Sequence, residues 1–123
     1  MNNKGQSLVT FVLIMPVVFL IMVLVYNVGS MILLKNELND INHIVINYGL
    51  DNITDEDIIN KMIMLVKKNK DSINNISVNI KDNKIYIILE DSIDTLIDFD
   101  GLFRVKSSYV GYMDENKKII ERN

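Results

Sequence analysis

The stretch that decides the fold is MNNKGQSLVTFVLIMPVVFLIMVLVYNVGSMILL, residues 1–34. No Lys, Arg, Asp or Glu occurs between Lys4 and Lys35. About 20 apolar residues in a helix rise about 30 Å, which is the thickness of the hydrocarbon core of a bilayer. The stretch therefore predicts a helix that crosses a membrane, or is stored in one before assembly, with residues 6–34 as its span.

A cleaved secretory signal is the other explanation of such a start. Signals have an apolar core of about 7 to 15 residues and end at a small-x-small cleavage site. Here the apolar run is longer and the sequence contains no alanine. The nearest small-residue site, residues 28–30, is followed by further apolar residues. A retained anchor is therefore the favoured interpretation.

The charges flanking this span predict its orientation. Lys4 and the amino terminus precede it without an acid, whereas Lys35 and Glu37 behind it offset each other. The positive-inside bias places the N-terminus in the cytoplasm and everything after Leu34 outside. We therefore expect a single-pass protein of the cytoplasmic membrane with an extracytoplasmic C-terminal domain.

The length of 123 residues leaves room for one anchor and one small domain, residues 35–123. The chain has no cysteine, so this domain has neither disulfides nor a thiolate metal site. The net charge is −3, and the lysines are spread among acids. This charge pattern argues against nucleic acid as a partner.

The apolar pattern continues past the predicted span as an amphipathic helix. We expect one continuous helix over residues 6–48, capped by Gly49. A second short helix is expected over residues 55–70, with Thr54 as its N-cap and Asp57 at its third helical position. The apolar stripe of the long helix comprises Leu34, Leu38, Ile41, Val45 and Tyr48.

From residue 76 onward, apolar side chains recur at every second position, which is typical of strands. Residues 76–80 and 85–89 alternate around the turn pair 82–83 and predict a hairpin. Residues 103–113 predict a third strand, and the charged tail from Asp114 is expected to fray. The predicted fold class is α+β: a long N-terminal helix, a short helix and a small three-stranded antiparallel sheet covered by helices on one face.

Residues 4–11, Lys-Gly-Gln-Ser-Leu-Val-Thr-Phe, together with Pro16 and the long apolar helix, resemble the start of the TadE-like family. These are minor pseudopilins of the tight-adherence (Flp-type) pilus, within the type IV pilin-like superfamily. The resemblance implies a basic leader, residues 1–5, that a prepilin peptidase cuts between Gly5 and Gln6. It also implies a pilin-like fold, and other pilin-like subunits and the pilus platform protein as partners.

One position departs from the family pattern. The glutamate that family members carry five residues into the mature chain is Thr10 here. In pilins that carboxylate pairs with a neighbouring subunit's N-terminal amine, and threonine cannot neutralise a charge. The resemblance therefore implies either a subunit at a filament tip or a membrane-held assembly factor.

Few residues are candidates for chemistry. His43 is the only histidine, and a zinc site needs three or four ligands. No Gly-rich phosphate loop or Gly-x-Ser-x-Gly elbow occurs. We expect no catalytic residue, no metal and no cofactor, and hence no enzyme. An acidic segment contains only a fragment of a calcium loop, at residues 98–101, and is expected to be a solvated loop; its carboxylates are Asp91, Asp94, Asp98 and Asp100.

The expected function is therefore non-catalytic: a pilin-like subunit that acts by helix packing in the lipid bilayer or in a filament. A membrane-anchored sensor or adaptor, with an uncut leader and no pilus role, is the alternative. A pseudopilin of a related secretion or DNA-uptake machine would share the mechanism. The residues expected to serve assembly and helix packing are Thr10, Phe11, Pro16, Gly29 and Ser30.

Overall fold

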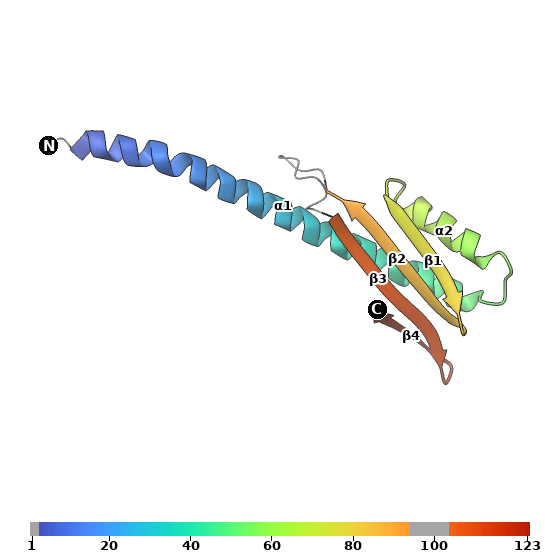
Figure 1. Ribbon diagram of the computed structural model, residues 1–123. Coiled ribbons are helices and arrows are strands. Elements are labelled where there is room, and N and C mark those ends of the chain that lie inside the picture. Colours follow the sequence, from blue (N-terminus) through green and yellow to red (C-terminus); the bar gives the residue numbers. More distant parts are fainter. Residues whose placement is uncertain (1–2, 94–103) are drawn as a thin grey trace.

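The computed structural model describes residues 3–93 and 104–123. The chain is α+β, with a long N-terminal helix, a second helix and one antiparallel sheet (Figure 1). The sheet has four strands, so the prediction of three was wrong. In chain order the elements are α1 (Asn3–Asp51), α2 (Ile58–Asn69), β1 (Asn75–Lys81), β2 (Lys84–Ser92), β3 (Arg104–Asp114) and β4 (Lys117–Arg122).

The helix α1 is continuous over 49 residues and extends beyond both predicted ends. Its first half projects from the rest of the chain, and its second half lies along the sheet (Figure 1). Most large apolar side chains of the projecting half are exposed, and Val23 is the buried one among them. One helix therefore has two environments: bare and apolar first, then packed against the domain.

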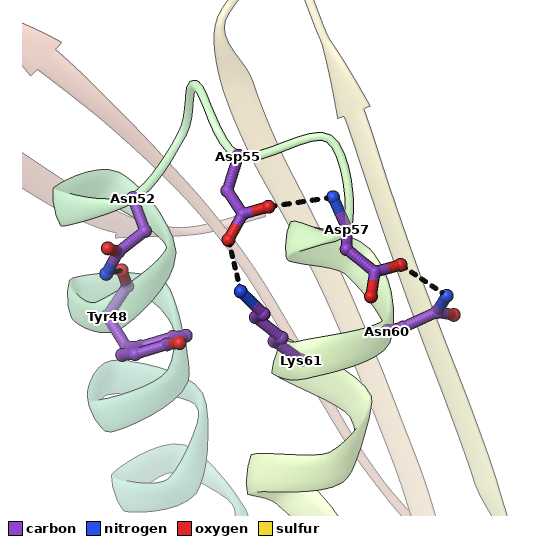
Figure 2. A network of polar contacts seen from close by, with 6 residues as sticks. All are labelled: Tyr48, Asn52, Asp55, Asp57, Asn60 and Lys61. Carbon is purple, nitrogen blue, oxygen red and sulfur yellow. Dashed lines mark hydrogen bonds and ion pairs between the residues drawn. The ribbon is translucent and has the colours of Figure 1, made fainter.

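Gly49 does not cap α1 as predicted, because it lies inside the helix and is buried. A Cβ atom there would lie 2.7 Å from Met62 Sδ and 2.8 Å from Ile85 Cδ1. The glycine therefore allows close packing rather than a left-handed turn. The last turn is closed instead by Asn52, whose Nδ2 donates to the main-chain oxygen of Tyr48 at 3.0 Å (Figure 2).

The turn between α1 and α2 differs from the predicted cap. The N-cap of α2 is Asp57, not Thr54, and no side chain donates or accepts a capping bond there. Asp55 organises the turn: its Oδ1 accepts from the Asp57 N–H at 3.0 Å, and its Oδ2 lies 2.5 Å from Lys61 Nζ (Figure 2). Asn60 Nδ2 donates to Asp57 Oδ1 at 2.9 Å. Asp55 and Asp57 therefore stabilise the turn before α2 and do not lie within the first turn of the helix.

The strands are antiparallel in the order β1-β2-β3-β4. The predicted hairpin turn is confirmed, since Asp82 and Asn83 have φ values of 53° and 61°. A second such turn, at Glu115 and Asn116 with φ values of 47° and 68°, leads into β4. The prediction of a frayed tail was therefore wrong. The predicted third strand is β3, and residue 103 lies outside the described residues.

The core lies between the helices and one face of the sheet. Figure 1 shows α1 crossing behind β2 and β3, with α2 beside β1. Four of the five residues of the predicted stripe are buried, and Tyr48 is half-buried. Strand residues that alternate toward the helices complete the core. Its buried members are Leu34, Leu38, Ile41, Val45, Ile46, Leu50, Ile58, Met62, Val66, Ile85, Ile87, Leu89, Val105 and Tyr109.

Candidate functional site

The residues predicted for processing lie at the free end of α1. Gly5 and Gln6 are both helical and exposed. A Cβ atom added to Gly5 would meet nothing within 4 Å. The bond between them is therefore far from the folded domain, at the tip of the projecting half (Figure 1).

Thr10 and Phe11 belong to a shallow groove that follows one face of the projecting helix. Thr10 lies three residues after Ser7, so their hydroxyls share this face, while Phe11 is exposed. The groove offers apolar contact and three neutral polar side chains, and no carboxylate lines it. Its lining residues are Gln6, Ser7, Thr10, Phe11, Ile14, Met15 and Val18.

Pro16, Gly29 and Ser30 are spread along α1 and do not meet. Pro16 lies inside the helix and has no N–H to donate to the carbonyl of Val12, although α1 runs through this point. A Cβ atom added to Gly29 would meet nothing within 4 Å, so no contact in the folded chain requires a glycine there. Ser30 lies where the helix reaches the domain. The structure thus separates the predicted packing residues into a projecting group and a pair at the junction.

A polar pocket of about 500 Å³ at this junction was not predicted. We call it the neck pocket. Lys70 is the residue that directly follows α2. Its Nζ lies 3.2 Å from Glu37 Oε2 and 3.9 Å from Asp91 Oδ2. The pocket is lined by Tyr26, Ser30, Leu33, Leu34, Glu37, Lys70, Ser72, Asn74, Asp91, Ser92 and Ile93.

Asp91 was expected in a solvated loop, and this was wrong. It lies in β2 and is only 5% exposed, because the strand runs to Ser92 and its odd-numbered residues face the helices. The sequence does contain a pattern that indicates burial, because Asp91 continues the alternation of Ile85, Ile87 and Leu89. The other three aspartates of the predicted loop, at 94, 98 and 100, lie outside the described residues.

His43 is exposed on α1, and its ring contacts that of Tyr109 edge-on, with centroids 4.9 Å apart. Within residues 3–93 and 104–123, no group of three or more His, Cys, Asp or Glu side chains could hold a metal ion. The histidine therefore covers the edge of the core rather than joining a cluster of ligands.

The projecting half makes α1 long and apolar enough to cross a membrane. Comparisons with protein-family models, with curated proteins and with solved structures found no match for this chain. The candidate site is thus a surface, the bare apolar half of α1 together with the junction where it enters the domain.

Proposed function

We propose that this chain is a pilin-like single-pass membrane subunit, a TadE-like minor pseudopilin or assembly factor of a tight-adherence pilus. The observation that supports it most is the continuity of α1 from a bare apolar half into a half packed on the sheet. A rigid connection of this kind transmits any displacement of the anchor to the domain. The subunit would act by helix packing and protein contacts.

In this proposal the bilayer holds the apolar half until assembly, with the N-terminus in the cytoplasm and the domain outside. A prepilin peptidase would remove residues 1–5, leaving Gln6 first. Thr10 cannot balance the new terminal amine of a neighbour, and burying an unpaired charge is unfavourable. The chain would therefore occupy a filament tip or assist assembly beside other pilin-like subunits and the platform protein.

Mass spectrometry of the mature protein from its native host tests this proposal. We expect an N-terminus at Gln6, and uncut chain in a strain without the prepilin peptidase. Gly5→Leu should block the cut, whereas Asn3→Leu, two residues away in the same leader, should not. An N-terminus still at Met1 would rule out processing.

The neck pocket favours one second candidate, a membrane-anchored sensor or adaptor. Its carboxylates and its lysine could recognise a small polar ligand beside the membrane. This candidate requires an uncut leader and function in a strain without the peptidase. The same mass spectra therefore separate the two candidates.

A further inference from the structure

A second groove lies on the opposite side of α1 from the neck pocket, between the helix and the start of β3. Its volume is about 470 Å³. Figure 1 shows β3 beginning beside α1, close to where the helix leaves the domain. We call it the basic groove; it is lined by Val28, Met31, Ile32, Lys35, Asn36, Arg104, Val105 and Lys106.

The basic groove is positively charged in a chain that is acidic overall. Three of its lining residues are Lys or Arg and none is Asp or Glu, although the chain has 13 basic and 16 acidic residues. Lys35 Nζ donates to the main-chain oxygen of Lys106, which holds the ammonium at the edge of β3. Burial, and secondarily the nearby Arg122, lower the pKa of Lys35. No acid lines the groove, so an anion would be favoured there, although Glu90 is the cross-strand partner of Lys106.

The depth of the groove matches the surface of a bilayer. At 1.5 Å per residue, Lys35 lies about 46 Å along α1 from Lys4. A bilayer with its headgroups is about 40–45 Å thick. If Lys4 lies at one surface, Lys35 lies among the headgroups of the other. Val28, about 36 Å along α1 from Lys4, then lies at the edge of the hydrocarbon, and Met31 and Ile32 continue the apolar side of the groove up among the headgroups.

We propose that the basic groove binds the phosphate of an anionic phospholipid in the extracytoplasmic leaflet. Lys35, Arg104 and Lys106 contact the headgroup, and an acyl chain lies against Met31 and Ile32. Cations above an apolar surface at headgroup depth complement a lipid, which has both a charged headgroup and apolar acyl chains. A soluble anion has no apolar part that could contact this surface. The bound lipid holds the start of β3 against the membrane before assembly. This inference rests on the proposed anchoring of α1.

The test uses the full chain in vesicles of phosphatidylcholine, with or without phosphatidylglycerol. Because the chain has no cysteine, Asn36→Cys places a single environment-sensitive fluorophore in the groove. We expect phosphatidylglycerol to increase its fluorescence in a salt-sensitive way. The apparent affinity should fall about fivefold for each cation removed in Lys35→Gln/Arg104→Gln/Lys106→Gln. Arg104→Gln/Lys106→Gln, which keeps Lys35, guards against misfolding of the triple variant.

A charge-matched control, Lys67→Gln/Lys68→Gln/Lys81→Gln, changes three exposed lysines outside the groove and should leave the response unchanged. Equal loss in this control, or equal fluorescence in both lipids, would overturn the headgroup site. The same change produced by inorganic phosphate in phosphatidylcholine vesicles would assign the groove to a soluble anion and also overturn it. Flotation separates the two proposals: a chain that fails to float with vesicles refutes the anchor itself, and with it the lipid site.

Discussion

At the scale of single residues, a buried polar contact fixes α1 on the sheet. Asn42 Nδ2 donates to Ser107 Oγ at 2.7 Å, and Ser107 Oγ donates to Asn39 Oδ1 at 2.7 Å. Both Asn42 and Ser107 are fully buried in an otherwise apolar layer. Because a buried polar group without a partner is costly, this contact favours one register of helix on strand.

Removing the hydroxyl of Ser107 should therefore destabilise the domain. We expect Ser107→Ala to lower the free energy of unfolding by about 1–3 kcal/mol, because it removes the hydroxyl partner of Asn42 and Asn39. Ser108→Ala, next to it but on the other face of β3, should change it by less than about 0.5 kcal/mol. Urea unfolding of the full chain in micelles, followed by tyrosine fluorescence, measures both. Equal effects would show that the buried contact does not fix the register.

Gly111 lies at a close approach of α1 to the sheet. A Cβ atom there would overlap Ile46 Cγ2. We expect Gly111→Ala to cost about 1–3 kcal/mol by overpacking, and Gly111→Ala/Ile46→Ala to cost less than the sum of the single changes. Gly29→Ala, which meets no atom, should be neutral or stabilising by up to about 1 kcal/mol. Additive costs in the same unfolding assay would contradict the steric explanation.

At the scale of elements, the turn before α2 depends on one ion pair. The hydrogen bond from Lys61, and then that from the Asp57 N–H, lower the pKa of Asp55 below its ordinary 3.8. A carboxyl with a lowered folded pKa stabilises the fold above its unfolded pKa, and this is lost as pH falls through the folded value. The start of α2 should therefore lose protection against amide exchange below about pH 4.

Asp55→Asn should remove this acid dependence, while Glu56→Gln, an exposed acid beside it, should keep it. Amide exchange of the full chain in micelles, measured by mass spectrometry from about pH 2.5 to about pH 6 with correction for the intrinsic rate, gives the answer. Unchanged acid dependence in Asp55→Asn would show that another carboxyl organises the turn.

The exposed apolar surface of the projecting half of α1 leads to a separate prediction about membrane insertion. Leu20 and Ile44 are similarly exposed on the same helix, 53% and 49%. Leu20→Lys should disfavour insertion by about 2.5–3.5 kcal/mol, because it places a charge in the hydrocarbon, whereas Ile44→Lys should not. The fraction of chain that resists alkaline extraction from membranes measures the difference. Equal resistance would contradict the boundary between the two halves of α1.

These elements differ in how much could be predicted from the sequence. The apolar run and the alternation before and after Asp82 predict α1 and the first hairpin, because both patterns are local. β4 lacks that pattern: Ile119 and Ile120 are adjacent and lie on opposite faces, paired with Tyr112 and Gly111. Its existence depends on pairing with β3, which periodicity in six residues cannot reveal.

At the scale of the whole molecule, the candidate site could be predicted only in part. The bare helix follows from composition, but the neck pocket and the basic groove arise where α1 meets residues far away in the sequence. Asp91 and Arg104 belong to no sequence motif. They line the two pockets only because β2 ends and β3 begins beside α1. The end of β2 and the start of β3, whose residues line the two pockets, lie near the point where the apolar helix leaves the domain (Figure 1). In the proposed anchoring of α1, the polar residues of both pockets would therefore lie near the membrane surface.

The orientation of the whole chain is the last prediction. Ser7 and Lys81 lie at opposite ends of the molecule and are both exposed. The chain has no cysteine, so Ser7→Cys and Lys81→Cys each provide one label site. We expect a membrane-impermeant maleimide to label Lys81→Cys in intact cells and Ser7→Cys only after permeabilisation, because the positive charge at Lys4 keeps that end inside. The reverse pattern would place the domain in the cytoplasm, where neither an extracytoplasmic headgroup site nor a pilus subunit could operate.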